Sequence, residues 1–111
     1  MAEPALTPSL ALDYLDELSI DIRAATILDS HDELVAHTGH PTESRERAER
    51  MRKLVLELLE RAGGPEVEVS TPNGAVFAVR ENGWTIAVVT GRYALSSLMF
   101  YDLRRVTEDL G

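Results

Sequence analysis

The chain has 111 residues, of which 44% are hydrophobic, and it carries a formal net charge of −8 and no cysteine. This length favours one domain with one modest core. The negative charge argues against nonspecific binding to nucleic acid or to an anionic membrane, because both need a positive surface, and the lack of cysteine excludes disulfides and thiolate metal sites.

The N-terminal segment MAEPALTPSL has neither a basic start nor a long apolar run. It therefore differs from a secretory signal, and no stretch of the chain approaches the roughly 18 apolar residues that a membrane span needs. We expect a cytoplasmic protein with no membrane partner, in which residues 1–6 form a flexible leader and residues 7–111 form a single domain.

Charge is placed unevenly along the chain. Up to residue 33 it carries eight acidic residues and one base, Arg23, whereas six of its eleven basic residues lie between positions 45 and 61. Solvated helix faces explain most single charges. The asymmetry also indicates that different faces of the domain meet different partners.

The first predicted element is a helix over residues 8–18. Thr7 suits an N-cap and Pro8 the first helical position, and apolar residues follow at helical spacing. Alternation from Ile20 to Thr26 then predicts a strand that runs to Leu28. The segment DSHDE at 29–33 supplies turn residues, and a short return strand is expected at 34–38.

A long helix is predicted next, capped by Thr42 or Ser44 and continuing to Arg61 before Gly63 and Gly64 end it. Its apolar residues step by three and four positions, and further leucines widen the stripe: Ala48, Met51, Leu54, Val55, Leu58, Leu59 and Ala62. A helix that only lies on a sheet needs one stripe. The extra apolar edge therefore either contacts another subunit or belongs to one broad stripe on the chain's own sheet, and both interpretations stay open.

Three strands are predicted at residues 66–70, 75–80 and 84–90. The turns TPNG and ENG separate them, and Asn-Gly is expected to adopt the positive φ of a tight hairpin at TPNG. The strand containing Val67 is predicted at a sheet edge, where it either adds a partner strand or is blunted by Glu66 and Glu68. The third strand is nearly all apolar, so it should be central and covered on both faces.

A last helix carries apolar residues at helical spacing from Leu95 to Leu110. The resulting order is αββαβββα. Five strands with connecting helices in this order predict an α+β fold, in which helices lie on the faces of one mostly antiparallel sheet.

Motifs for catalysis or for metal and nucleotide binding are missing from the sequence. Lys53 has none of the glycines of a phosphate-binding loop. The spacing of His37 and His40 would suit a helical metal site, but Gly39 and Pro41 deny a helix there, and we expect exposed loop histidines.

Acidic and hydroxyl side chains do not form a convincing catalytic group either. Ser96 and Ser97 have no histidine partner nearby and no nucleophile elbow. The acids of the first helix are expected to hydrate it. An enzyme that uses acids near Asp29 and Asp32 is a third hypothesis, without motif support.

Three pieces of the chain share the order, spacing and texture of a known family. They are LDYLDELSIDIRAATILDSHDELVAHTG (12–39), the long helix closed by two glycines, and VEVSTPNGAVFAVRENGWTIAVVTGRYALSSLMFYDLRRVTEDL (67–110). Together they resemble the Roadblock/dynein light chain family. One departure lies in DSHDE, where family members often have Asp-Gly and this chain has Asp32 and Glu33, which puts the turn geometry in question.

The resemblance implies a profilin-like fold, with a five-stranded antiparallel sheet flanked by helices, and a protein that is not an enzyme and needs no cofactor. It further implies a homodimer formed through the long helix and the adjacent edge strand. Carried over by position, the dimer interface would comprise Met51, Leu54, Val55, Leu58, Val67 and Val69.

Besides the enzyme hypothesis, two functional hypotheses follow. The first is a non-enzymatic homodimeric adaptor or regulator of a small Ras-like GTPase, of the kind found among prokaryotic members of the family. No motif marks Arg45, Arg47 or Arg92 as an arginine finger. The alternative is a small-molecule-binding sensor domain of profilin-like architecture, with a pocket lined by Phe77, Trp84 and Tyr93.

Overall fold

The computed structural model describes residues 6–18, 21–38 and 44–110. Its elements follow the expected order: α1 (Pro8–Leu18), β1 (Ile22–Leu28), β2 (Leu34–His37), α2 (Ser44–Ala62), β3 (Glu66–Thr71), β4 (Gly74–Glu81), β5 (Trp84–Thr90) and α3 (Ser96–Asp109). The five strands form one antiparallel sheet in the order β2-β1-β5-β4-β3. The predicted α+β fold is therefore confirmed, with β5 at the centre and β3 at one edge.

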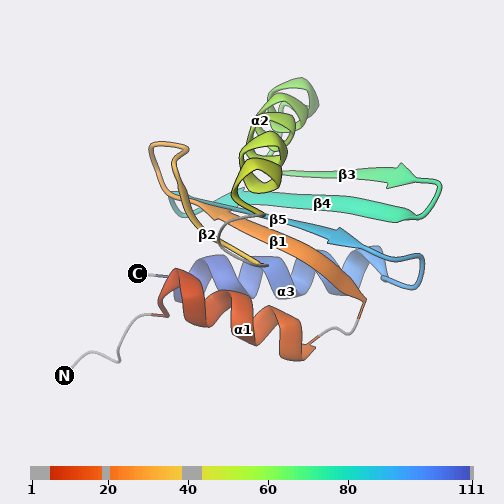
Figure 1. The fold of residues 1–111 in the computed structure, drawn as a ribbon, viewed down its shortest axis with the longest axis horizontal. Coiled ribbons are helices and arrows are strands. Elements are labelled where there is room, and N and C mark those ends of the chain that lie inside the picture. The colour runs from red at the N-terminus through yellow and green to blue at the C-terminus, as the bar shows by residue number, and fades with distance from the viewer. Residues whose placement is uncertain (1–5, 19–20, 39–43, 111) are drawn as a thin grey trace.

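The helices form two layers on opposite faces of the sheet (Figure 1). α1 and α3 lie together on one face, whereas α2 crosses the other. α2 contacts β1, β2 and β3, while α3 contacts β4 and β5. The sheet is thus covered by two helices on one face and by one on the other.

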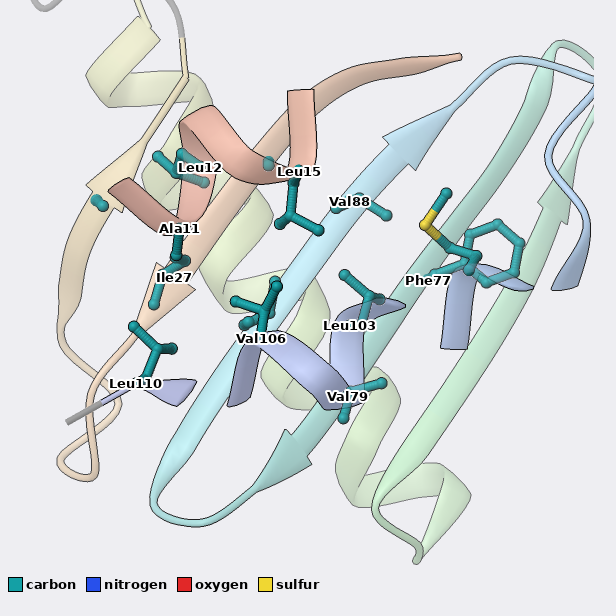
Figure 2. Packing of buried hydrophobic residues seen from close by; sticks show 14 of the residues in the cluster. Ala11, Leu12, Leu15, Ile27, Phe77, Val79, Val88, Leu103, Val106 and Leu110 are labelled. Carbon is teal, nitrogen blue, oxygen red and sulfur yellow. The ribbon is translucent and has the colours of Figure 1, made fainter. Parts of the chain in front are cut away.

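The larger core lies between the sheet and the pair α1 and α3 (Figure 2). Alternate strand residues point into it, because successive side chains of a strand face opposite sides. Phe77 of β4 is 1% exposed, and its ring meets that of Phe100 edge to face, with centroids 5.4 Å apart. Leu15 from α1 and Leu103 from α3 close the core from outside the sheet.

The smaller core lies beneath α2. Val55 and Leu59 pack there against Ala78 of β4 and Ala87 of β5. The short alanine side chains let the helix approach the sheet closely. Met51 and Val67 are half-buried at the margin of this cluster.

The hairpin turns differ from the prediction in one respect. Asn82 and Gly83 both have positive φ, +57° and +80°, so the positive-φ Asn-Gly pair occurs in the ENG turn between β4 and β5. In TPNG the turn residues are Pro72 and Asn73, and neither has positive φ. Gly74 instead begins β4, where the backbone of Thr90 leaves no room for a Cβ atom.

Leu6 belongs to the folded domain, although the sequence predicts it within the leader. Its N–H donates to Asp109 O at 2.9 Å, it pairs with Leu110, and its side chain packs against the larger core. The rest of the predicted leader lies outside the described residues, as do Ile20 and Thr42. Among the described helices, none is long and apolar enough to cross a membrane.

Candidate partner interface

α2 has apolar side chains on two of its sides. Val55 and Leu59, at 1% and 4% exposure, face the sheet, whereas Leu54 is 46% exposed on the outside. Met51 and Leu58 are half-buried, so their exposure lies between that of Leu59 and that of Leu54. The helix therefore has more apolar surface than its own sheet covers.

The edge strand β3 adds two further apolar residues to this side. Val67 pairs with Ala78 and Val69 with Val76. Ala78 lies beneath α2, and side chains paired across an antiparallel ladder share a face. Val67 and Val69 therefore lie on the α2 side of the sheet, and both are half-buried.

The acidic residues of β3 lie on the opposite face. Glu66 forms an ion pair with Arg104 of α3, and Glu68 accepts a 2.9 Å hydrogen bond from Ser96 Oγ. Glu66 and Glu68 are therefore bonded to α3. Their side chains therefore point away from the α2 side of β3, where Val67 and Val69 lie.

Five of the six predicted interface residues share one side of the molecule, which we call the α2–β3 face: Met51, Leu54, Leu58, Val67 and Val69. Val55 differs from the other five. Its side chain is already buried against the chain's own sheet, so it supports α2 from below and offers no surface of its own. Whether two copies associate through this face stays a prediction.

Asp32 fixes α2 to the sheet. Arg52 Nε of α2 donates to Asp32 O at 2.7 Å, and the Asp32 carboxylate accepts from Arg80 of β4. Asp32 has a φ of +61°, the left-handed conformation that glycine adopts most easily. The DSHDE turn therefore contains a left-handed residue at position 32, although it lacks the glycine of Asp-Gly.

Asp29 closes the same turn from its other end. Its Oδ1 accepts hydrogen bonds from the amides of His31, at 2.8 Å, and Glu33, at 3.1 Å. These bonds, that from Glu33 first, lower the pKa of the Asp29 carboxyl. A general acid needs a raised pKa, so Asp29 is unsuited to that role. The hydrogen bonds of Asp29 and Asp32 hold the turn and its neighbours together.

The aromatic pocket of the sensor hypothesis is contradicted by the structure. Phe77 is buried in the larger core, whereas Tyr93 is 88% exposed. Trp84 begins β5 and Tyr93 follows its end, so the length of this seven-residue strand, roughly 20 Å of extended chain, separates the two. The three residues line no common cavity.

A hollow of about 550 Å³ lies instead between α1 and the edge strand β2. Its charged and titratable lining consists of Asp13 and Asp16 from α1, His37 from β2 and Arg45 from α2. No pattern in the sequence predicts this site. Its lining comes from three elements, and no local motif marks residues that only the fold brings together.

The remaining predicted residues carry no chemistry of their own. Among the described residues, no group of three histidines or acids could hold a metal ion, and His40 lies outside them. His31 is exposed in the β1–β2 turn. His37, expected to be exposed in a loop, is instead half-buried at the end of β2, because that strand extends through it. Arg92 donates to Pro72 O at 3.0 Å, and Arg47 is exposed on α2.

Known proteins resemble this chain in structure but do not match it in sequence. No protein-family model and no curated protein matches the sequence. The Roadblock/LC7 domain from Streptomyces avermitilis is similar in structure, with a TM-score of 0.72 over 90% of this chain and 94% of that one at 16% identity. The chain has the Roadblock/LC7 fold. The fold expected from the resemblance is therefore confirmed.

Two further solved structures are similar to this chain. The gliding protein MglB from Thermus thermophilus matches with a TM-score of 0.65 over 98% of this chain and 95% of that one, at 16% identity. MglC from Myxococcus xanthus matches with 0.51 over 79% and 82%, at 12% identity. At these identities the likeness establishes the Roadblock/LC7 fold, and function has to be argued from the surface.

Proposed function

We propose that this chain is a non-enzymatic, homodimeric adaptor or regulator of a small Ras-like GTPase. The observation that carries the proposal is the α2–β3 face, where exposed Leu54 lies on the same side as the apolar residues of an edge strand. An apolar face beside an open strand edge favours association with another protein surface.

A two-fold dimer would use this face on both copies. Two β3 edges can pair antiparallel and join the sheets, while the outer sides of the α2 helices pack on each other. Leu54, Met51 and Leu58 would then lose their remaining exposure. Val55 would keep its place beneath the helix and contribute by holding it rigid.

Regulation would follow from differential binding. A rigid dimer that binds one nucleotide state of a GTPase more tightly shifts the population toward that state, by as much as its affinities differ. Arg92 already donates to the backbone of the β3–β4 turn. No sequence motif marks Arg45 or Arg47 as an arginine finger, so we expect any acceleration of hydrolysis to come from positioning the GTPase's own residues.

The structural neighbours support the assembly part of this proposal. One solved MglB structure, 16% identical to this chain with a TM-score of 0.66, is described as having a tetrameric arrangement. Self-association therefore accompanies the Roadblock fold in that protein. The family resemblance supplies the GTPase as the expected partner.

Light scattering on the purified chain tests the dimer. Leu54→Asp should convert a dimer into a folded monomer, because it places a carboxylate in an apolar seam without touching the chain's own core. The matched control is Val35→Asp, since Val35 is similarly exposed, at 43%, but lies on β2 at the far edge of the sheet. A monomeric wild type, or equal dissociation by both variants, would refute the α2–β3 dimer.

Nucleotide-dependent binding tests the partner. The chain is mixed with a Ras-like GTPase from the same genome, loaded either with GDP or with a non-hydrolysable GTP analogue. We expect binding to one state to exceed binding to the other by at least about tenfold. Failure to bind any such GTPase, or equal binding to both states, would leave the regulator proposal without support.

The hollow between α1 and β2 favours the sensor alternative. It mixes carboxylates, an imidazole and a guanidinium, which suits a small ligand carrying both charges. A metabolite that raises the unfolding temperature of the wild type but not of Asp16→Asn would establish this alternative. If no metabolite in such a screen does so, the hollow is a surface depression only.

A further inference from the structure

The outer sides of α1 and α3 form a second apolar surface, far from α2. Leu10, Tyr14 and Leu18 of α1 are 55%, 41% and 44% exposed, and Leu98 and Tyr101 of α3 are each 56% exposed. We call these five residues, together with Arg105, the α1–α3 face. Large apolar side chains gathered on one side mark an interaction surface more often than single exposed leucines do.

Helical spacing places each set of residues in one row. Leu10, Tyr14 and Leu18 are four residues apart, and Leu98, Tyr101 and Arg105 follow at three and four. Both helices lie on the same face of the sheet and contact each other (Figure 1). The two rows therefore belong to one side of the molecule.

Arg105 belongs to the α3 row and contacts Tyr101 of the same helix. Its Nη1 donates to Tyr101 Oη at 3.1 Å, and its guanidinium lies 5.8 Å from the centre of the Tyr101 ring. The pKa of Arg105 is raised chiefly by that hydrogen bond, with smaller contributions from Asp109 and Tyr14.

The charge around this face is strongly negative. α1 carries three acids and no base, and α3 carries three acids and two arginines. Arg104 forms an ion pair with Glu66 of β3. Arg105 is the second arginine of α3, and α1 has no arginine or lysine. The apolar rows are thus flanked by carboxylates, among them Glu17 and Asp109.

This combination excludes three kinds of occupant. Anionic lipid and nucleic acid would both meet carboxylates without compensating cations. A second copy of the chain would bring two acidic surfaces together, and like charges facing each other oppose association. A positively charged protein segment with apolar side chains faces neither obstacle.

We propose that the α1–α3 face binds a basic amphipathic helix of a partner protein. Apolar side chains at helical spacing would pack between the two rows, and flanking lysines or arginines would face the acids. This surface lies on the opposite side of the sheet from α2. The proposal therefore does not depend on the dimer or on the GTPase.

A fluorescein-labelled peptide of about 18 residues tests the proposal, long enough for about five helical turns. It contains leucines at helical spacing and lysines elsewhere, and its binding to the full chain is measured by fluorescence anisotropy. We expect Leu98→Ser and Tyr14→Ser each to weaken binding at least about fivefold. Glu17→Lys and Asp109→Lys should each weaken it up to about fivefold.

Two matched controls separate this face from general stickiness. Val35→Ser removes a similarly exposed apolar residue elsewhere and should leave the affinity unchanged. A peptide with the same leucines but glutamates in place of lysines should bind at least about tenfold more weakly. Circular dichroism checks that each variant keeps its fold.

Mapping of amide chemical shifts gives the location of binding. Perturbations should concentrate on α1 and α3 and spare α2. The proposal is overturned if the lysine peptide does not bind at concentrations up to about 0.5 mM, if both peptides bind equally, or if the shifts centre on the α2–β3 face.

Discussion

The guanidinium of Arg80 lies 2.5 Å from the carboxylate of Asp32, which links β4 to the β1–β2 turn. The Asp32 carbonyl accepts from Arg52 of α2 at the same time. Asp32 therefore links α2 to the sheet beneath that helix. The position of the α2–β3 face depends in part on this link.

Substitution of Asp32 separates its backbone role from its charge. Asp32→Ala should lower the free energy of unfolding by about 1–2 kcal/mol, since the left-handed conformation costs alanine about 1 kcal/mol and the half-exposed ion pair adds at most about 1. Asp32→Gly loses the same ion pair without the backbone cost, so it should lose less. Urea denaturation measures both, and equal losses would contradict the backbone role.

The turn carboxylate Asp29 should make stability depend on acidic pH. Its pKa is lower in the folded chain than in the unfolded chain, so its stabilisation is present above about pH 4 and is lost as the pH falls through the folded pKa. Asp29→Asn keeps the acceptor oxygen and removes the titration. The difference in unfolding temperature between wild type and variant should shrink from pH 7 to about pH 3. A constant difference would argue against this role.

Gly74 should tolerate no side chain. A Cβ atom there would collide with the carbonyl of Thr90, which belongs to the central strand and cannot move alone. Gly74→Ala should therefore lower the free energy of unfolding by more than about 2 kcal/mol. Gly64→Ala is the matched control, because its Cβ would meet open space and should change stability by less than about 1 kcal/mol. Thermal denaturation of the two variants compares them directly.

A proline in β3 should block the proposed dimer without unfolding the chain. Arg80 N donates to Pro65 O, and ladder bonds alternate along an antiparallel strand, so the amide of Ser70 points away from β4. Ser70→Pro removes a donor that only a partner strand would use. The dimer dissociation constant, measured by light scattering on dilution, should rise at least about tenfold.

Val69→Pro provides the control for the edge strand. By the same alternation the amide of Val69 points toward β4, so this variant should lose about 3 kcal/mol of folding stability. If Ser70→Pro unfolds the chain as readily as Val69→Pro does, the assigned ladder register is wrong. If it folds and still dimerises fully, the β3 edge takes no part in the dimer.

The order of elements was predictable because each depends on its own neighbours in the chain. The helical spacing from Leu10 to Leu18 and the apolar run in β5 each fix a local structure, and the structure confirms both. The sequence predicts the positive-φ Asn-Gly pair at TPNG, whereas the structure has it in the next hairpin, at ENG. Thr90 approaches Gly74 across the sheet, and local turn statistics carry no information on that contact.

The sequence alone determined the secondary structure, the αββαβββα order and the surplus of apolar residues along α2, since periodicity and turn chemistry act over a few residues. Only the tertiary structure decided which of those residues remain available. Val55 is hidden because Ala78 and Ala87 let α2 settle onto the sheet there, whereas Leu54, one residue earlier, turns about 100° away from it. The same holds for the α1–α3 face, where two helices distant in the chain are neighbours because both pack on the same face of the sheet.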